Sequence, residues 1–529
     1  MQRPGVPALH KPRLLVAWAR VRRVMAPSAA LQSASLAPQG PGQKSVAVIG
    51  GGAAGLVAAR ELLRESHCVT VFEQGPGLGG VWKYDPQTEQ DDPLGLRPDR
   101  QRVHSSMYAR LRTNLPREVM AFLDFPFDAL TMQGRSSDPR RFCGHEEVQR
   151  YLEAFAEAFA LEQHMRFNMR VQQLTPLPHS QLDSANGLDS TEQGCPRGQA
   201  AIWNGASNET SSNGASTGRE YSQEFDAVVV CNGHYSQPRL PDVAGAAAFP
   251  GRQLHSHNYR ENSAFAGQAV VVVGASASGE DICREVAEVA DKVYLCARSW
   301  QNPAWTHETT PIGQRANIWR RPMVQALGAN GSVTFTDGQT LERVDCILYC
   351  TGYQYAFPFL EDAGVVSIED NRVSPLFQHI FPPTAPSLAF VGLPWRVVPF
   401  PQMELQSKWV ARVLSGRVSL PAAVDMQRWV DDRYRELDAK QVPVRYTHYQ
   451  GDAQWAYNDW LAEACGPDVP KLPSWREAMY KATGNNKRDF PEKYRDVWRD
   501  EGLVEQAAVD ARKSRSRPQH AVVEGVAAA

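Results

Sequence analysis

The sequence predicts an α/β protein with two Rossmann-like dinucleotide-binding domains and a helical C-terminal region. The first observation is a pattern that occurs twice: an apolar run, a turn of small residues, a helix and a second apolar run, once from residue 45 and again from residue 270. Strand, turn, helix and strand in this order open a parallel α/β sheet. The second observation is a helical pattern with several Trp and Tyr residues after residue 420. Two dinucleotide units in one chain predict two nucleotide cofactors.

The first unit has the glycine spacing of a dinucleotide-binding loop. Gly50, Gly52 and Gly55 match G-x-G-x-x-G between a predicted strand at residues 46–49 and a predicted helix at residues 56–63. The first glycine permits the tight turn, the second lets the backbone approach a pyrophosphate, and the third lets the helix pack close to the strand. The helix N-terminus then offers free N–H groups to the phosphates. The predicted cofactor-binding residues of this loop are Gly50, Gly52, Ala54 and Gly55.

A carboxylate selects the nucleotide at this first site. The strand predicted at residues 69–73 ends in Glu73, which lies 18 residues after Gly55. A carboxylate there accepts hydrogen bonds from a ribose diol and repels a 2′-phosphate. The first site therefore suits FAD or NAD rather than NADP.

The second unit keeps the small residues of the loop. Gly274, Ser276 and Gly279 give G-x-S-x-x-G after a predicted strand at residues 270–273, and a helix is predicted from Glu280. Serine in place of the middle glycine still leaves a loop of small residues, which is what close phosphate approach requires. The predicted cofactor-binding residues of this loop are Gly274, Ser276, Ala277, Ser278 and Gly279.

Arg298 replaces the acid that would select an unphosphorylated ribose. It follows a predicted strand at residues 292–297 and lies 19 residues after Gly279. A guanidinium in this place favours a 2′-phosphate, so the second site is predicted to bind NADPH through Arg298.

Several motifs resemble those of the flavin-containing monooxygenases. Residues 73–82 give E-x5-G-G-x-W, which resembles the FAD site of this family, and residues 249–259 give F-x-G-x-x-x-H-x-x-x-Y, which resembles its identifying motif. Residues 388–401 resemble the plant and yeast branch. The resemblance covers nearly all of residues 45–499 and is closest to the plant-type S-oxygenating subgroup.

The resemblance implies further site residues. Asn114 corresponds to the active-site Asn of the family, where its amide would donate a hydrogen bond to the peroxide or to NADP+. By residue type alone, Asn114 would be a turn residue before Leu115 and Pro116. Thr351 ends a strand that resembles one lying near the cofactor in the family. The residues implied in this way are Gly80, Val81, Trp82, Thr113, Asn114 and Thr351, with Asn114 as the catalytic residue; no metal ligand is predicted.

The resemblance also implies the reaction. NADPH reduces FAD, the reduced flavin reacts with O2 to give a C4a-hydroperoxide, and bound NADP+ shields that group. The sulfur of a thioether or the nitrogen of an amine then takes up one oxygen atom. The cofactor performs the chemistry, while the protein orients it and excludes water.

The expected domains follow the two loops. Residues 45–237 and 341–503 form the FAD-binding domain with the helical C-terminal region, and residues 238–340 form an NADPH-binding domain inserted into it. Residues 178–220, rich in Ser, Asn, Gly and Thr, are expected to form a mostly disordered surface insertion. Residues 504–529 are expected to be a loose tail.

The N-terminal extension has a composition of its own. Residues 1–44 contain seven Lys or Arg residues and no acid. An Arg-rich, acid-free start is typical of an organelle transit peptide, which would direct the protein to a chloroplast or mitochondrion. A disordered tail, or translation from Met25, is the alternative and would leave the protein cytoplasmic.

Composition limits the partners. The net charge of -2 over 529 residues argues against a nucleic-acid binder. No uncharged apolar run is long enough to span a membrane. The physiological substrate and the oligomeric state stay open, and a homo-oligomer is one alternative.

Three other functions compete with S- or N-oxygenation. A flavin-dependent disulfide reductase needs a redox cysteine pair, and no C-x-x-C is present. A Baeyer–Villiger or keto-acid oxygenase is disfavoured by Tyr259, because that motif usually ends in Trp in those enzymes. A flavoprotein that consumes NADPH and releases H2O2, as an oxidase or a redox sensor, is the third.

Overall fold

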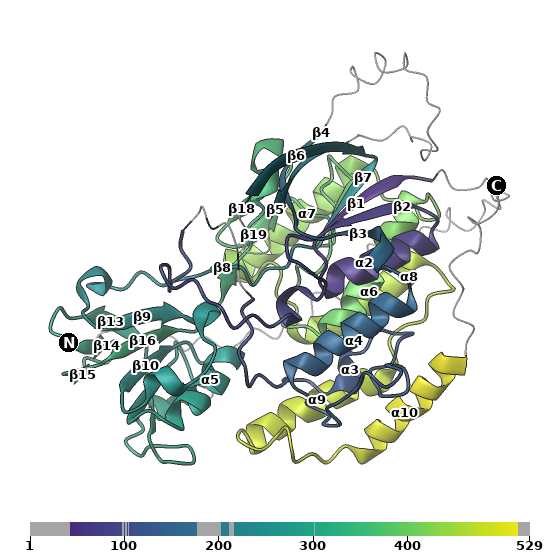
Figure 1. Ribbon diagram of the computed structural model, residues 1–529. Coiled ribbons are helices and arrows are strands. Elements are labelled where there is room, and N and C mark those ends of the chain that lie inside the picture. Colours follow the sequence, from purple (N-terminus) through teal and green to yellow (C-terminus); the bar gives the residue numbers. More distant parts are fainter. Residues whose placement is uncertain are drawn as a thin grey trace.

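The computed structural model describes residues 43–97, 100, 103, 105–176, 203–210, 216–300 and 302–516. The expected targeting signal and the Met25 alternative lie outside these residues. Figure 1 shows two lobes, each built around a sheet, with the C-terminal helices gathered at the larger lobe. Within the described part of the chain, no helix is long and apolar enough to cross a membrane.

The first sheet consists of five parallel strands in the order β20–β7–β1–β2–β3. Their bounds are Ser45–Ile49 (β1), Cys68–Phe72 (β2), Met165–Arg166 (β3), Ala227–Val230 (β7) and Leu388–Phe390 (β20). Strands β1 and β7 are runs of Val, Ile and Ala and are buried apart from Ser45. Near-continuous apolar runs of this kind suit a parallel sheet that is covered on both faces.

The second sheet repeats this design with the order β12–β11–β10–β16–β9, again all parallel. Its strands are Arg252–His255 (β9), Ala269–Val273 (β10), Lys292–Cys296 (β11), Ile318–Arg321 (β12) and Cys346–Tyr349 (β16). The chain leaves the first sheet after β7, builds the second sheet, and returns to the first as β20. Because β16 pairs with β10, the second unit extends past residue 340, where the sequence placed its boundary.

Short antiparallel strands complete the β-structure. The chain passes from the first lobe to the second after β7 and returns after β16. The strands β8 (Gln237–Pro238) and β17 (Tyr353–Gln354) pair these two connecting segments with each other. The remaining strands are Val324–Leu327 (β13), Val333–Phe335 (β14), Thr340–Leu341 (β15), Ser367–Glu369 (β18) and Arg372–Ser374 (β19).

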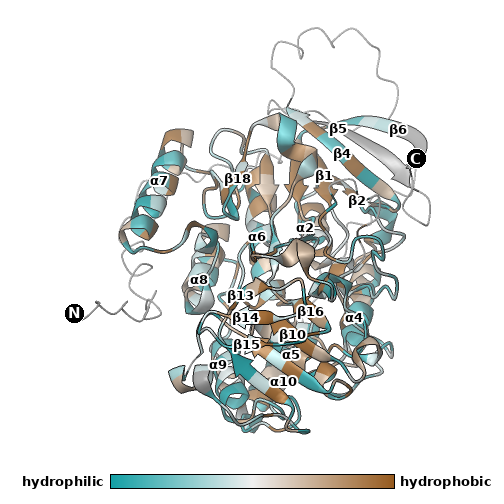
Figure 2. Cartoon of the chain, turned by 90° about the vertical axis from the view of Figure 1, so that its left-hand side faces the viewer, coloured by the Kyte–Doolittle hydropathy of each residue, from teal (hydrophilic) through white to brown (hydrophobic). Residues whose placement is uncertain are grey.

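Nine α-helices are present in the described residues, and those around the sheets follow their apolar spacing. The helices of the sheet lobes are Ala53–Arg64 (α2), Arg117–Met120 (α3), His145–Ala158 (α4), Ala277–Ala287 (α5) and Pro399–Leu414 (α6). The C-terminal helices are Ala423–Ala439 (α7), Gln454–Cys465 (α8), Ser474–Asp489 (α9) and Glu501–Ser516 (α10). In α4, Val148, Tyr151, Leu152 and Phe155 are buried, which is the i, i+3, i+4, i+7 stripe of a packed helix. In Figure 2 the strands β10 and β16 of the second sheet appear brown and therefore apolar.

The predicted loose tail is helical over its first part. Helix α10 runs to Ser516, and Ala507 is buried against Trp475 and Met479 of α9. Arg515 also forms an ion pair with Asp128. Contacts with α9, rather than local composition, therefore order this segment; α9 and α10 lie side by side in Figure 1.

The predicted disordered insertion also contains ordered strands. An antiparallel sheet joins β4 (Met169–Pro176), β5 (Trp203–Thr210) and β6 (Ser216–Phe225). A polar composition did not prevent pairing, because neighbouring strands supply the backbone hydrogen bonds. The rest of the insertion, residues 178–202 and 211–215, lies outside the described part of the chain.

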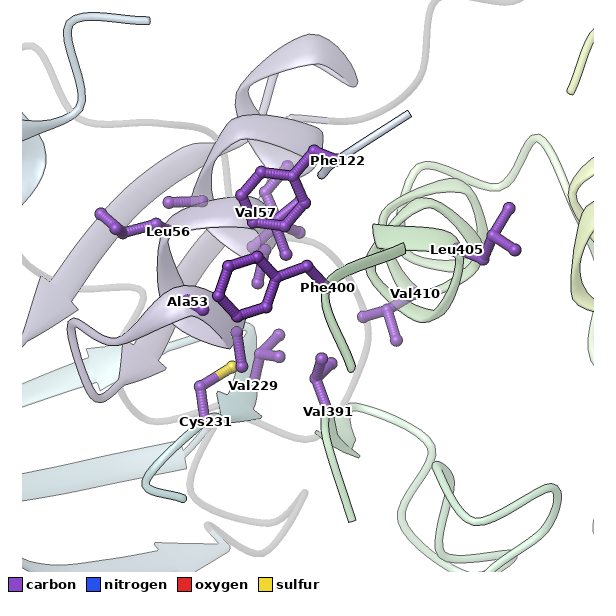
Figure 3. Close-up of a cluster of buried hydrophobic side chains, with 14 of the residues drawn as sticks. Ala53, Leu56, Val57, Phe122, Val229, Cys231, Val391, Phe400, Leu405 and Val410 are labelled. Carbon is purple, nitrogen blue, oxygen red and sulfur yellow. The ribbon is translucent and has the colours of Figure 1, made fainter. Parts of the chain in front are cut away.

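One apolar core connects the first loop to the C-terminal half of the chain. Figure 3 shows Ala53 and Val57 of α2 beside Phe122 and beside Phe400 of α6, with Val229 of β7 below them. These residues come from four separate stretches of sequence. The core therefore fixes the first turns of α2 and α6 relative to each other.

Buried charges join the same two helices. Arg60 of α2 is 2% exposed and donates hydrogen bonds to Glu61 at 2.8 Å, to Asp124 at 2.7 Å and to Glu404 of α6 at 2.9 Å. Lys408 forms ion pairs with Glu61 and Glu404 at 2.9 and 3.0 Å. Removing one partner of a buried ion pair typically costs ~3–5 kcal/mol, because the other charge is left uncompensated. The cluster therefore holds α2 and α6 in one relative position.

Candidate active site and nucleotide loops

The first loop is the tight strand-to-helix turn that its glycines predict. Gly50 has φ +108°, and a Cβ at this position would lie 2.5 Å from the carbonyl oxygen of Cys231. A Cβ on Gly55 would lie 1.8 Å from the carbonyl oxygen of Gly50. Only glycine fits at either position, so the backbone of α2 presses directly against the end of β1.

The N-terminus of α2 can accept an anion. Gly52 is the N-cap residue, and no side chain caps the helix. The N–H groups of a first helical turn have no partner within the helix, and they suit a phosphate. Ala54, also predicted at this site, is buried in that first turn. These groups fit the pyrophosphate of a dinucleotide.

Glu73 follows β2 directly, as predicted. Its carboxylate accepts hydrogen bonds from the backbone N–H groups of Gly51 and Gly75, both at 2.7 Å. Burial raises the pKa of Glu73, while these two hydrogen bonds and Lys83 act in the opposite direction. An ionised carboxylate has acceptor capacity beyond two hydrogen bonds, so a ribose hydroxyl fits beside it.

The predicted turn with Gly80, Val81 and Trp82 lies against this loop. It forms a short 3-10 helix, Gly80–Trp82 (η2), and the N–H of Gly79 donates to the carbonyl of Gly51 at 2.9 Å. The Trp82 ring makes an edge-to-face contact with Phe400, 6.3 Å between centroids. The structure thus brings this turn, the first loop and the start of α6 together.

The second loop has the same geometry. Gly274 has φ +109°, and a Cβ there would lie 2.4 Å from the carbonyl oxygen of Cys350. A Cβ on Gly279 would lie 1.7 Å from the carbonyl oxygen of Gly274. Ser276 is the N-cap residue of α5 and its side chain caps nothing. Ser276 and Ser278 are exposed, which leaves this helix N-terminus accessible to a second dinucleotide.

Arg298 lies where the sequence predicts it, two residues after β11. It is exposed, and its hydrogen bond goes to the Tyr446 hydroxyl at 3.4 Å. The guanidinium has five N–H donors, so most of them stay available for an anion. A 2′-phosphate fits this position.

Thr113 and Asn114 lie in the loop before α3. Thr113 is buried, its N–H donates to the carbonyl of Cys143 at 2.9 Å, and its hydroxyl has no partner among the residues that the structure describes. Asn114 is exposed, and its amide bonds no other residue that the structure describes. The fixed backbone thus presents an amide without a partner among the described residues, as a positioned hydrogen-bond donor requires.

Thr351 lies at the second loop rather than the first. It follows β16, which is the neighbour of β10, and its hydroxyl donates a hydrogen bond to the carbonyl of Arg239. A Cβ on Gly274 would lie 3.7 Å from the Thr351 nitrogen. Thr351 therefore joins the two chain segments that connect the lobes, at a point beside the second nucleotide loop.

Two residues near the first site were missed from the sequence. Gly392 (φ +89°) follows β20, and its N–H donates to Gln406 of α6 at 3.0 Å. A Cβ on Gly392 would lie 3.8 Å from the Cβ of Ala54. Lys83 is the cation that acts on the Glu73 carboxylate. A glycine two residues after a buried strand was the available signal for Gly392; nothing in the sequence marked Lys83.

In the motif at residues 249–259, the side chains of His255 and Tyr259 are buried and make packing contacts. Tyr259 is buried against Tyr108 and Phe265, with ring centroids 5.5 and 5.9 Å away. His255 is fully buried, and its Nδ1 accepts a hydrogen bond from the N–H of His257 at 3.1 Å. Burial, together with His257, lowers the pKa of His255 to about 3. This histidine is therefore neutral at physiological pH and packs the strand β9 into its lobe.

The chain matches the flavin-binding monooxygenase-like family over residues 43–308 and 315–474. It is 47% identical over 469 residues to flavin-containing monooxygenase FMO GS-OX-like 4 of Arabidopsis thaliana, which covers 88% of this chain and 96% of that protein. With flavin-containing monooxygenase FMO GS-OX2 of the same plant, the identity is 43% over 470 residues, 88% of this chain and 95% of the other.

A solved structure agrees with these relatives. S-allyl-L-cysteine S-oxygenase from Allium sativum superposes with a TM-score of 0.78 at 44% identity, and the match covers 90% of this chain and all of that one. The chain belongs to the flavin-binding monooxygenase-like family. It is a flavin monooxygenase, and FAD is the cofactor that this membership implies.

Within the described residues, the free cysteines do not provide the redox-active pair that a disulfide reductase needs. The free cysteines of the described chain are all buried: Cys143, Cys231, Cys283, Cys296, Cys346, Cys350 and Cys465. Burial raises the pKa of these thiols, which disfavours the reactive thiolate. Cys68, at the start of β2, is in a disulfide.

We expect Gly52→Ala to fold but to bind FAD weakly. A Cβ at Gly52 would meet Gly80 at 3.4 Å, an ordinary contact, and Gly52 has negative φ (-81°). The added methyl would instead occupy the place of the pyrophosphate. FAD affinity should fall at least about tenfold, ~1.4 kcal/mol, by flavin fluorescence titration of the stripped protein. Ser276→Ala, at the matching position of the second loop, should keep its FAD; equal FAD binding by both variants would contradict the assignment.

Proposed function

We propose that this protein is an FAD-dependent, NADPH-consuming monooxygenase that transfers one oxygen atom of O2 to the sulfur of a small thioether. The observation that supports this most is the match to an S-allyl-L-cysteine S-oxygenase, at 44% identity over 90% of the chain. Both nucleotide loops lie inside the family match over residues 43–308. A small molecule with an alkyl thioether is therefore the proposed substrate class.

The two loops would hold different cofactors. In this proposal, the first loop and Glu73 hold FAD, because a carboxylate suits an unphosphorylated ribose. The second loop and Arg298 hold NADPH, because a guanidinium suits a 2′-phosphate. The NADPH unit then extends from residue 238 to the end of β16, and residues before and after it form the FAD unit.

The overall reaction balances with these partners. A thioether, O2, NADPH and a proton give a sulfoxide, water and NADP+; NADPH supplies two electrons, and sulfur is oxidised by two. Bound FAD supplies the means of activating O2. The protein's own work is to orient the cofactors, admit the thioether and exclude water.

In this proposal, Asn114 donates the hydrogen bond that orients a group bound in the active site. An amide donates a hydrogen bond without transferring its proton. The Asn114 side chain could therefore orient the oxygen bound at the flavin, or the carboxamide of the nicotinamide, without reacting with it. Its exposed position beside the buried Thr113 supports this role.

A substrate comparison tests the proposed function. The full-length protein, loaded with FAD, would be given NADPH and O2 with an S-alkyl cysteine, a tertiary amine or a cyclic ketone. Sulfoxide formed close to one per NADPH, with little H2O2, is the expected result. Lactone or ester from the ketone would instead indicate a Baeyer–Villiger enzyme. Preferential N-oxide formation would move the substrate class to amines, and H2O2 in place of every product would indicate an oxidase or sensor.

Arg298→Ala should weaken NADPH selectively. Hydrogen bonds to charged groups contribute about 1.5–3 kcal/mol, so the KM for NADPH should rise roughly tenfold or more, with little change for NADH. Arg343→Ala is the matched control: the same charge at the opposite end of the second sheet, just before β16. Equal losses with both nucleotides would remove Arg298 from the 2′-phosphate site.

Asn114→Ala should uncouple the reaction while leaving the flavin in place. We expect unchanged FAD content and a sulfoxide yield per NADPH lowered about tenfold or more, since a positioned hydrogen bond in an active site contributes at least ~1.4 kcal/mol. Sulfoxide and H2O2 would be measured side by side. Asn485→Ala, on the C-terminal helix α9, is the control. If the Asn114 variant couples as well as the parent, Asn114 lies outside the active site.

A further inference from the structure

Arg495, which lies between α9 and α10, contacts both halves of the site. Its Nη1 donates to Asp281 of α5 at 3.1 Å, and its Nη2 is bonded to the second oxygen of the same carboxylate. Its Nε donates to the carbonyl of Thr113 at 2.9 Å, and Nη2 also reaches the carbonyl of Arg112 at 3.3 Å. One guanidinium thus joins the helix of the second nucleotide loop to the residue before Asn114.

The α5 side of this contact lies next to the second nucleotide loop. Asp281 is the fifth residue of α5, directly after Glu280 in its first turn. The side chains of Asp281 and Arg495 are each 17% exposed, so water screens this pair only weakly. The hydroxyl of Tyr108 lies 3.4 Å from the same carboxylate. The Asp281 carboxylate therefore connects α5 directly to Arg495.

The loop side is equally constrained. Arg112 binds Asp496 through two hydrogen bonds, 2.8 and 3.1 Å, and donates its Nε to the carbonyl of Phe142 at 2.9 Å. Residues 112–113 are therefore bound to the C-terminal segment in two ways, through the Arg112 side chain and through their own backbone carbonyls. Asn114, the next residue, has a side chain that bonds no other described residue, on a backbone held by Arg495.

We propose that Arg495 is a positioning residue that sets the Asn114 loop relative to the NADP(H)-binding helix α5. The inference rests on the proposed function, because it assigns the second loop to NADP(H) and Asn114 to the oxygenation site. It assigns no contact with either cofactor to Arg495. Its effect passes through the carbonyl of Thr113 on one side and the carboxylate of Asp281 on the other.

The shape of the guanidinium suits this role better than its charge alone. A planar fork with five donors binds a carboxylate through two parallel hydrogen bonds and keeps Nε for the carbonyl. Lysine carries all its donors on one nitrogen, so it cannot bind the Asp281 carboxylate and the Thr113 carbonyl in one fixed geometry. If charge neutralisation of Asp281 were the whole function, lysine would replace arginine without loss.

Lys487 provides the matched control. It lies in α9 and pairs with Glu280, the residue before Asp281, at 2.9 Å. It therefore also joins the C-terminal segment to the first turns of α5 by an ion pair. Unlike Arg495, it has no hydrogen bond to residues 112–114.

The experiment compares Arg495→Gln, Arg495→Lys, Asp281→Asn and Lys487→Gln in the FAD-loaded, full-length protein. Hydrogen–deuterium exchange of the peptide containing residues 108–118 would be followed with and without NADP+, alongside NADP+ affinity, FAD content and sulfoxide per NADPH. The parent and Lys487→Gln should show protection of this peptide on NADP+ binding. Arg495→Gln and Arg495→Lys should lose it, with coupling lowered at least about fivefold.

A double variant separates this pairwise role from general destabilisation. The double variant Arg495→Gln with Asp281→Asn should lower the sulfoxide yield per NADPH no further than either single change, because the two changes remove the same contact. Retained protection and coupling in Arg495→Gln, in a protein whose parent makes sulfoxide, would overturn the inference. Full recovery in Arg495→Lys would also overturn it, in favour of charge neutralisation. A parent that makes no sulfoxide at all would instead contradict the proposed function, and the NADP+-dependent exchange would still report on the contact.

Discussion

The structure depends on one steric constraint, which is the direct contact of a helix backbone with the end of a strand. At the first loop, the missing side chain of Gly55 lets α2 lie against the carbonyl of Gly50; at the second, Gly279 does the same at Gly274. A side chain at either place would push the helix away and move its free N–H groups off the edge of the sheet. The predicted anion site is therefore a consequence of packing, because the free N–H groups that would bind a phosphate lie wherever the helix can approach.

That local contact is held in place by parts of the chain hundreds of residues away. Arg60 on α2 is bonded to Glu404 on α6, and Phe400 of α6 packs on Phe122. Buried ion pairs contribute little net stability but cost much when one partner is lost, so such a cluster enforces one arrangement. The same helix α6 follows the Gly392 turn, which lies beside Ala54. Helix α6 therefore forms one wall of the predicted first nucleotide site.

The sequence predicted the elements whose signal is local. Both glycine loops, Glu73 and Arg298 lie where spacing placed them, since a turn between a buried strand and a helix is determined by neighbouring residues. The sequence did not predict α10, whose Ala507 is ordered by Trp475 and Met479, or β5 and β6, whose pairing depends on β4. Thr351 was placed near a cofactor, but which loop it joins depends on β16 pairing with β10. Long-range pairing leaves no mark in local composition.

The two loops share one geometry and differ in their surroundings, and this difference fits the proposed cofactor roles. Gly51, Ala53, Ala54 and Gly55 are buried, and Glu73 is fixed by two backbone hydrogen bonds. Ser276, Ser278 and Arg298 are exposed, and Arg298 has a single long hydrogen bond, at 3.4 Å, among the described residues. A preorganised, enclosed site loses little entropy on binding and releases its ligand slowly, whereas an open site with an exposed cation exchanges its ligand readily. A flavin that stays bound through every turnover requires the first kind of site, and a nicotinamide nucleotide that must leave after each turnover requires the second.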